Sequence, residues 1–308
     1  MPELPEVETV ARGVGRLATG RVIASVRLIR PDVAHGQARP SDRLLRGRRI
    51  ECVSRRGKQI HIDFSGGLSM IVHLGMTGRL SVCPKTAPLD PHTHLRMAFA
   101  DRDDELRFVD PRRFGGVWLI ASALRPDRGG DERSTGQPAT QSDAAPRAAR
   151  PSLRAPEARR WYGRRLPPVG EDPLTLSLAD WRRLLARRRQ IKALLLDQRP
   201  ISGVGNIYCD EALHRAGIHP LRRANELPPA AVDRLYRALR RVLIEAIAAG
   251  GSSVNDYRDA DGKAGWFQTR HRVYGREGRT CRRCRTPIEK ILAAGRGTHF
   301  CPHCQPRA

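Results

Sequence analysis

Hydrophobic patterning changes once along this chain, and the change limits the folds that the sequence can adopt. The first 120 residues contain eight short apolar runs, separated by turn residues. They fall at 22–30, 49–54, 59–64, 69–73, 79–83, 95–100, 106–109 and 116–120. Short runs rich in Val, Ile, Leu and Phe are typical of strands, and so many in one block indicate a β-sandwich or barrel.

The second half of the chain has helical spacing instead. From about residue 176, apolar positions recur every three to four residues, as on one face of a helix. Between the two patterns, 125–160 is rich in Arg, Ala, Pro and Ser and has no period, which predicts a disordered insertion or surface loop. We therefore expect an α+β multidomain fold, in which an N-terminal helix and β-sandwich precede a helical domain.

The balance of charge is strongly basic. Lys and Arg total 56 against 32 Asp and Glu, a formal net charge of +24 at pH 7. Because neutralised phosphates release counterions, this excess favours a nucleic-acid partner. Genome bias toward arginine would also produce it. The sequence has no apolar run of about 18 residues and no basic-then-apolar leader, so we expect a cytoplasmic protein.

Four of the seven cysteines form one C-terminal cluster. Cys281-x2-Cys284 and Cys301-x2-Cys304 can each direct two thiolates at one ion, and two such turns complete a tetrahedral zinc site. With four cysteine ligands no position stays open, which predicts one structural Zn²⁺. Disulfide pairing is the alternative, and it is disfavoured in a reducing compartment. Arg296, just before the second pair, is placed to meet a phosphate or is simply a solvated loop residue.

The start of the chain, Met1-Pro2-Glu3-Leu4-Pro5-Glu6, has two interpretations. Proline followed by acids is ordinary chemistry for a helix start, and Val7, Val10 and Val14 continue one apolar stripe. If Met1 is removed, however, Pro2 becomes a terminal secondary amine with a pKa of about 8, partly neutral and nucleophilic. Its iminium with an aldehyde-level carbon has no N–H to lose and acts as an electron sink.

Several motifs together resemble one family, bacterial formamidopyrimidine-DNA glycosylases of the formamidopyrimidine/endonuclease VIII family. The resemblance covers nearly the whole chain, in the family's order. It rests on the residues 2–9 and on Arg56-Gly57-Lys58, His73-Leu74-Gly75-Met76-Thr77-Gly78, Asp110-Pro111-Arg112-Arg113-Phe114-Gly115, 192–198, 203–208 and the four cysteines. The insertion 125–160 is longer than the family usually carries, and Gly170-Glu171-Asp172-Pro173-Leu174 stands where Gly-Pro-Glu-Pro-Leu is common.

The resemblance implies a fold and its divisions. These are an N-terminal catalytic β-sandwich domain over 1–124, an insertion or linker over 125–165, a helix-two-turn-helix DNA-binding domain over 166–270, and a zinc finger over 271–308. The stretch 252–270 corresponds to the family's loop over the extruded base.

The resemblance also implies a bifunctional enzyme of base excision repair. It would excise oxidised purines such as 8-oxoguanine and formamidopyrimidines through a Schiff base at the N-terminal proline, followed by β,δ-elimination. Pro2 would be the nucleophile at C1′, Glu3 the acid that opens the sugar ring, Glu6 a supporting hydrogen-bonding group, and Lys58 a contact to the phosphates beside the lesion.

Further residues match the family's contacts with double-stranded DNA. Met76, Arg112 and Phe114 correspond to the side chains that fill the gap left by an extruded base, although a core Met and Phe with a surface Arg would fit the sequence equally well. The remaining candidates are the phosphate contacts His73, His92, Lys192, Asn206, Tyr208 and Arg296. Buried structural histidines and glycine-dependent helix packing around residue 205 are the alternatives.

Two other functions stay open at this point. One is an endonuclease VIII-type glycosylase for oxidised pyrimidines. The other is a catalytically silent, zinc-containing nucleic-acid-binding protein on the same scaffold. In each case we expect a monomer without a membrane partner. For an enzyme of this family in a bacterium, we expect association with the nucleoid.

Overall fold

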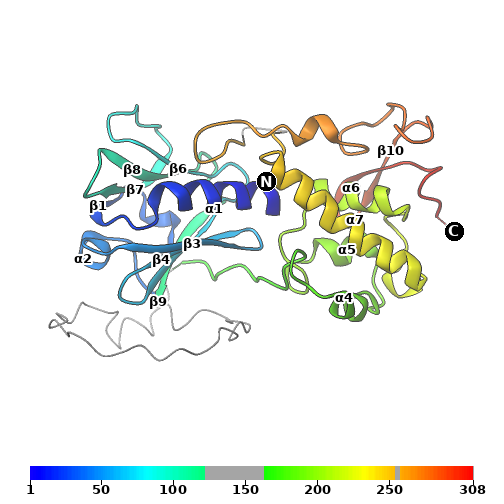
Figure 1. Cartoon of the computed structure of the whole chain (residues 1–308), viewed down its shortest axis with the longest axis horizontal. Coiled ribbons are helices and arrows are strands. Elements are labelled where there is room, and N and C mark those ends of the chain that lie inside the picture. The colour runs from blue at the N-terminus through cyan, green and yellow to red at the C-terminus, as the bar shows by residue number, and fades with distance from the viewer. Residues whose placement is uncertain (122–162, 254–256, 308) are drawn as a thin grey trace, which may run out of the picture.

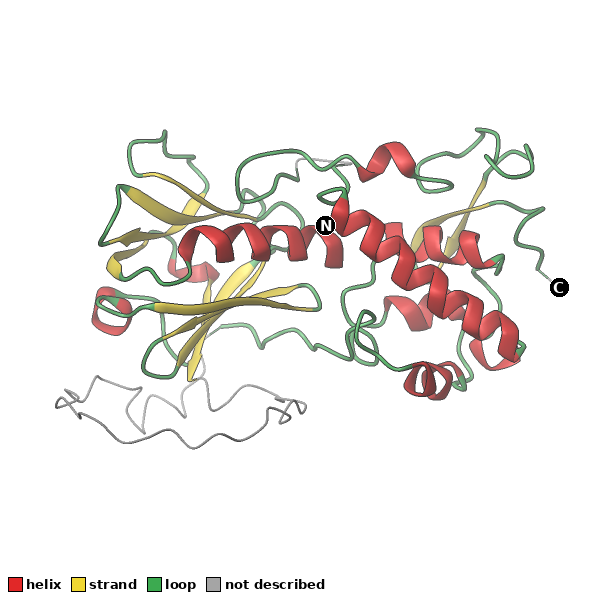
Figure 2. Ribbon diagram, viewed as in Figure 1, coloured by secondary structure: helices red, strands yellow, loops and turns green. Residues whose placement is uncertain are grey.

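The chain folds into two halves that lie end to end, with the N-terminus between them (Figure 1). This computed structural model describes residues 1–121, 163–253 and 257–307. Strands and one long helix make up the first half, and helices with a small hairpin make up the second (Figure 2). The predicted insertion over 125–160 lies outside the described residues.

The first half is a β-sandwich, as the short apolar runs predict. One sheet has the order β1-β7-β8-β6 and the other the order β2-β9-β5-β4-β3. The strands are β1 Ile23–Leu28, β2 Ala34–Gly36, β3 Ile50–Arg56, β4 Gln59–Phe64, β5 Leu68–His73, β6 Arg79–Pro84, β7 Thr93–Phe99, β8 Asp104–Val109 and β9 Gly116–Ala121. Each of the eight predicted runs overlaps a strand, so the sandwich prediction is confirmed.

Helix α1, Leu4–Ala18, packs against both sheets through the stripe expected from the sequence. Val7, Val10 and Val14 are buried in the core of the sandwich. Two elements of this half lack a sequence signal. Strand β2 is only three residues long and pairs in parallel with β9, and α2, Asp42–Leu45, is a single turn. Both are too short for periodicity to reveal them.

The second half is a helical domain around its own core. Its helices are α4 Leu178–Leu185, α5 Ile191–Leu196, α6 Asn206–Ala216 and α7 Pro229–Ala248, followed by the short 3-10 helix η4 Phe267–Arg270. The core includes Trp181, Leu195, Leu213 and Leu239, all nearly inaccessible. Within the described residues, no helix is both long and apolar enough to cross a membrane. A β10–β11 hairpin, Glu289–Ala293 and Arg296–Phe300, follows.

Contacts between the halves position the start of the chain. The backbone N–H of Leu4 donates to the carbonyl of Gly203 at 2.9 Å. Arg55, on β3, makes ion pairs of 2.6 Å with Glu8 of α1 and 2.5 Å with Asp172 of the second half. Because the Arg55 side chain is largely buried, these pairs are well shielded from solvent. The first turn of α1 is thereby held against the segment that leads into α6.

Candidate functional site

The N-terminus borders a cavity of about 650 Å³ whose walls come from both halves. We call it the central cavity. Met1, Lys58 and His73 of the first half line it together with Gln198 and Arg296 of the second. Pro2 is buried at the start of α1, immediately behind Met1. The sequence-predicted nucleophile therefore lies one residue from a cavity with several basic side chains.

Glu3 lies at the N-terminus of α6. Its carboxylate accepts the backbone N–H groups of Ile207 at 3.0 Å and Tyr208 at 3.3 Å. Unpaired N–H groups at a helix start attract an anion, so this is a favourable place for a carboxylate. Gly205 is required here because a Cβ on it would collide with the Glu3 carboxyl. Burial raises the pKa of Glu3, opposed by the Lys58 charge and these two N–H groups.

Glu6 is the second buried carboxylate, one turn further along α1. It accepts the N–H of Glu3 at 2.8 Å and that of Ser252 at 2.7 Å, and the Tyr208 hydroxyl also donates to it. Burial and the neighbouring Glu3 raise the pKa of Glu6 to about 7. We call Glu3 and Glu6 the buried carboxylate pair. Ser252 links this pair to the stretch 252–270, of which 254–256 lie outside the described residues.

Lys58 lies in the tight turn between β3 and β4, next to Gly57, which adopts a φ of +55°. Its side chain is buried, and burial lowers the pKa of its ammonium group. Glu3 and Glu6 raise that pKa, while Arg296 lowers it further. His73 lies on the same wall, and burial lowers its pKa to about 4, so the ring is neutral near pH 7. The ring accepts the N–H of Gly75 through Nδ1 at 3.1 Å.

Met76, Arg112 and Phe114 lie exposed on two neighbouring loops of the sandwich. Met76 is 43% exposed and Phe114 50%, and the Arg112 guanidinium lies 4.7 Å from the Phe114 ring centre. We call these three residues the exposed triad. Because both side chains are about half exposed, the alternative of a core Met and Phe is wrong.

Buried Asp110 holds the two loops of the triad together. Its carboxylate accepts the Thr77 hydroxyl at 2.7 Å and the N–H of Gly115 at 2.8 Å, so it contacts both loops. Gly75, with a φ of +61°, allows the loops to touch because a Cβ there would collide with the backbone of Gly115. The triad is exposed, but its backbone is well fixed.

The prediction that Lys192 and Tyr208 contact phosphates is wrong, because both side chains are fully buried. Lys192 is fully buried, and its ammonium group donates to Asp210 at 2.6 Å and to Thr298 at 2.7 Å. It joins α5 and α6 to the β10–β11 hairpin and has no path to a phosphate. Tyr208 is also fully buried, with its hydroxyl on Glu6 and its N–H on Glu3. Its role here is to support the carboxylate pair.

The other predicted contacts remain accessible to different degrees. Arg296 is exposed at the start of β11 and lines the central cavity. His92 is exposed just before β7 and is not among the residues that line that cavity. Asn206 is half-buried and donates to the carbonyl of Gly297 at 2.9 Å. Tyr274, which no sequence pattern singles out, lies beside the Asn206 side chain and edge-on to His299.

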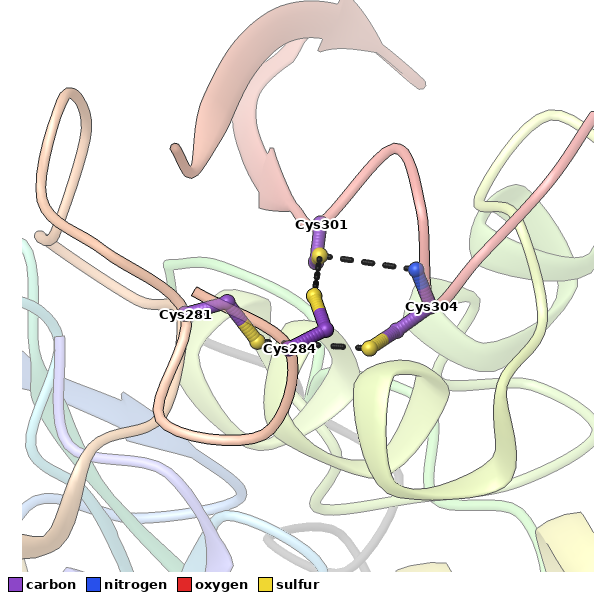
Figure 3. Close-up of side chains that lie close together, drawn as sticks. All are labelled: Cys281, Cys284, Cys301 and Cys304. Atoms are coloured by element: carbon purple, nitrogen blue, oxygen red, sulfur yellow. Dashed lines mark hydrogen bonds between the residues drawn. The ribbon is translucent and has the colours of Figure 1, made fainter. Parts of the chain in front are cut away.

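The four C-terminal cysteines converge as predicted (Figure 3). Their sulfur atoms all lie within 4.8 Å of one another. The Sγ atoms of Cys281 and Cys304 are 4.0 Å apart, and those of Cys284 and Cys301 are 3.4 Å apart. Tetrahedral zinc with bonds of about 2.3 Å needs sulfur separations of about 3.8 Å, so the set fits one Zn²⁺. Four thiolates fill the coordination shell, which makes the site structural.

The zinc cluster is anchored to α6 by buried polar groups. Gln305 accepts the N–H of Cys301 at 2.9 Å and donates to the carbonyl of Ile218 at 2.8 Å. Glu211 of α6 accepts three successive backbone N–H groups, those of Arg272, Val273 and Tyr274. The hairpin that carries Arg296 is therefore held firmly against the helix that binds Glu3.

Sequence families match three parts of the chain. The N-terminal domain of formamidopyrimidine-DNA glycosylase matches residues 1–117, the H2TH domain of the same enzyme matches 169–258, and the zinc finger found in FPG and IleRS matches 278–307. The formamidopyrimidine-DNA glycosylase of Thermus thermophilus is 42% identical over 310 residues, which are 99% of this chain and 98% of that protein. The chain belongs to the formamidopyrimidine-DNA glycosylase family.

Solved structures of this family have the same fold. The MutM (Fpg) protein of Thermus thermophilus covers 100% of both chains with a TM-score of 0.75 and 39% identity. A mutant of the Lactococcus lactis Fpg in complex with DNA that contains Fapy-dG gives a TM-score of 0.79 at 32% identity, over 99% of this chain and 100% of that one. These matches confirm the predicted fold class, a β-sandwich half, an H2TH half and a zinc finger, and they support the structural zinc.

Proposed function

We propose that this glycosylase-family protein is bifunctional, excising oxidised purines from double-stranded DNA and then cutting the strand at the abasic site. The observation that carries the proposal is the position of the N-terminus beside Lys58: Met1 and Lys58 line the central cavity, and the charges of Lys58 and Glu3 both act on the N-terminal amine. A terminal amine, an adjacent carboxyl group and a cation are the groups that amine-based excision requires.

The proposed reaction begins once Met1 has been removed. The Pro2 amine attacks C1′ of the damaged nucleotide, and the base leaves with the electron pair of the glycosidic bond. The Pro2 nitrogen then loses its proton, which balances the proton that the departing base takes up. Glu3, whose raised pKa favours the protonated form, gives a proton to O4′ as the sugar ring opens. The product is an iminium between Pro2 and C1′, which retains its positive charge because proline has no second N–H.

Strand cleavage then follows from the iminium. Loss of a C2′ proton breaks the C3′–O3′ bond, and loss of a C4′ proton breaks the C5′–O5′ bond, so that both phosphates leave. Water hydrolyses the remaining sugar fragment from Pro2 and regenerates the amine. Burial and nearby Lys58 and Arg296 lower the pKa of the Met1 amine. The same surroundings would keep part of a freed Pro2 amine neutral and nucleophilic.

The other sites bind and open the duplex in this proposal. A base inside a duplex must be extruded, at a cost of a few kcal/mol, before its C1′ can be reached. The exposed triad fills the gap, while Lys58, His73, His92, Asn206 and Arg296 contact phosphates. Glu6 supports Glu3. The protein acts as a monomer on nucleoid DNA, and the domain divisions at 124/125, 165/166 and 270/271 are part of the same proposal.

A base-release assay tests this function. The protein, with Met1 removal verified by mass spectrometry, is incubated with duplexes containing 8-oxoguanine, thymine glycol or no lesion. We expect release of 8-oxoguanine and a nick with phosphate on both sides of the gap. Release of thymine glycol but not 8-oxoguanine would indicate the endonuclease VIII-type specificity. Release of neither base would contradict an enzymatic function.

A further inference from the structure

Arg164 belongs to none of the motifs described above, yet it contacts the loop that carries two members of the exposed triad. It lies on the segment that leads from the sandwich into the helical half. Its guanidinium group donates to the carbonyl of Phe114 at 3.2 Å and also to the carbonyl of Gly115. The Nε–H donates to His35 Nε2 at 3.1 Å. One planar fork therefore holds two successive carbonyls of the loop.

The backbone around Arg164 is built for this contact. The indole N–H of buried Trp118, on β9, donates to the Arg164 carbonyl at 2.8 Å. Gly163 has a φ of +61°, and a Cβ there would collide with the His35 ring. Burial, together with the Arg164 charge, lowers the pKa of His35 to about 4, so the ring is neutral and Nε2 can accept. Both the backbone and the side chain of Arg164 are thus fixed.

The same loop is held on its other side by Asp110, which accepts the N–H of Gly115 at 2.8 Å. Arg164 and Asp110 together satisfy the carbonyls of Phe114 and Gly115 and the N–H of Gly115, while the Arg112 and Phe114 side chains remain exposed. Because the backbone of the loop is held from both sides, its side chains lose little conformational entropy when they bind a partner. Such preorganisation lowers the entropic cost of binding.

The segment continues from Arg164 to the wall of the central cavity. Three residues on, the carbonyl of Pro167 accepts the side-chain amide of Gln59, and both residues line that cavity. At Gly170 the backbone N–H donates to the carbonyl of Gln198, another residue of the cavity wall. The segment 163–170 therefore connects the triad loop directly to the place where the flipped nucleotide would be received.

We propose that Arg164 is a positioning residue that holds the Arg112–Phe114 loop in the geometry needed to fill the gap in damaged DNA. This inference rests on the proposed function of the exposed triad. Arg164 acts through the loop and makes no contact with the reacting atoms. Its loss should leave the chemistry at Pro2 intact and impair the insertion of Phe114.

The test uses the full protein and a duplex with a tetrahydrofuran abasic analogue opposite 2-aminopurine, whose fluorescence reports the stacking around the gap. Emission is measured at saturating protein, so that differences in affinity do not enter. We compare wild type with Phe114→Ala, Arg164→Ala and Arg164→Lys. Arg165→Ala is the matched control, since it removes an equal charge from the next position of the same segment.

We expect Phe114→Ala and Arg164→Ala each to reduce the emission change, and the double variant to be no worse than Phe114→Ala alone, since coupled residues are not additive. Arg164→Lys, which keeps the charge but lacks the fork, should resemble Arg164→Ala. It also serves as the folded variant if alanine is not tolerated. In single-turnover excision of 8-oxoguanine, Arg164→Ala should be slower by up to about 10²-fold, the cost of a misplacement of about 1 Å.

Two outcomes would overturn the inference and are distinguishable. If Phe114→Ala reduces the emission change but both Arg164 variants match Arg165→Ala, the triad function stands and the positioning role of Arg164 is refuted. If Phe114→Ala leaves the emission change intact, the proposed function of the triad fails, and the inference that rests on it fails as well.

Discussion

The buried carboxylate pair and the exposed triad differ in their exposure to solvent, but both are held in place by a fixed backbone. Glu3 and Glu6 are 4% and 2% exposed, whereas Met76 and Phe114 are 43% and 50% exposed. In both places the backbone is fixed by buried hydrogen bonds and by a glycine that permits close approach. In the buried pair, the fixed surroundings determine the pKa values of the two carboxyl groups. In the triad, the fixed backbone presents side chains that we propose to enter the gap in damaged DNA.

We therefore expect substitutions in the two regions to impair different steps. A change in the buried pair should affect proton transfer and leave DNA binding largely intact, because DNA contacts come from elsewhere. A change in the triad should affect the opening of the duplex and spare later chemical steps. Substitutions in each region test this division between chemistry and duplex opening. We expect the largest effect at Glu3.

Glu3→Gln should reduce excision of 8-oxoguanine by about 10²–10⁴-fold, the usual contribution of a positioned acid or base. An amide keeps the shape of the carboxyl group but cannot donate its proton to the sugar. Binding to a tetrahydrofuran duplex should remain within about threefold of wild type, because Glu3 faces α6 and not the DNA surface. A parallel loss of binding would break the division between chemistry and recognition.

Lys58→Ala should slow base excision by about 100-fold, in the range for loss of one preorganised electrostatic contact. In addition to contacting the phosphates beside the lesion, Lys58 is proposed to assist expulsion of the base. Nicking of a preformed abasic site, which has no base to expel, should therefore fall much less. Both rates are measured under single-turnover conditions. Equal losses on the two substrates would show that Lys58 serves binding or iminium chemistry in general.

The raised pKa of Glu6 makes stability depend on pH. Its folded pKa of about 7 exceeds the ordinary 4.5, so its protonated form stabilises the fold below about pH 4.5, and that contribution is lost as the pH rises through 7. Relative to Glu6→Gln, the wild-type free energy of unfolding should fall by on the order of 3 kcal/mol across this window. Denaturant titrations at several pH values measure it.

A matched control for that titration is Glu51→Gln, which alters an exposed glutamate at the start of β3. Its free energy of unfolding should follow the wild-type pH dependence. If Glu6→Gln also follows the wild-type curve, Glu6 is ionised throughout the window, and its three hydrogen-bond donors outweigh its burial.

Met76→Ala should have the smallest effect of the four, a decrease of about fivefold in excision from duplex DNA, comparable to the loss of about 1 kcal/mol of contact. The thioether fills a gap only where a stacked base has been extruded. Excision of 8-oxoguanine from a mismatched duplex, which opens more easily, should therefore be less affected. Equal loss in both contexts would place Met76 outside the opening step.

Much of the fold could be predicted because it depends on local pattern. Eight strands, the N-terminal helix and the helical character of the second half follow from apolar spacing, and the zinc site follows from cysteine spacing. Pro2, Glu3 and Glu6 are adjacent in the sequence, so their chemistry could be considered together. Strand β2 could not be predicted, because three residues are too few to show an apolar repeat.

The remaining features depend on distant partners. Lys192 looked available for DNA because its partner Thr298 lies 106 positions away, on a hairpin whose docking no local pattern reveals. Tyr208 likewise meets Glu6 across 202 positions. Arg164 and Tyr274 lie in no motif, and only the three-dimensional arrangement places them beside Phe114 and Asn206.

The most direct test of the account is to trap the covalent intermediate. Protein whose Met1 is removed is mixed with an 8-oxoguanine duplex and borohydride, which reduces an iminium to a stable amine, and the linked residue is mapped by mass spectrometry. We predict an adduct at Pro2, and none from protein that retains Met1 but unfolds at the same temperature. An adduct at Lys58, or an adduct that forms equally well with Met1 retained, would contradict the account.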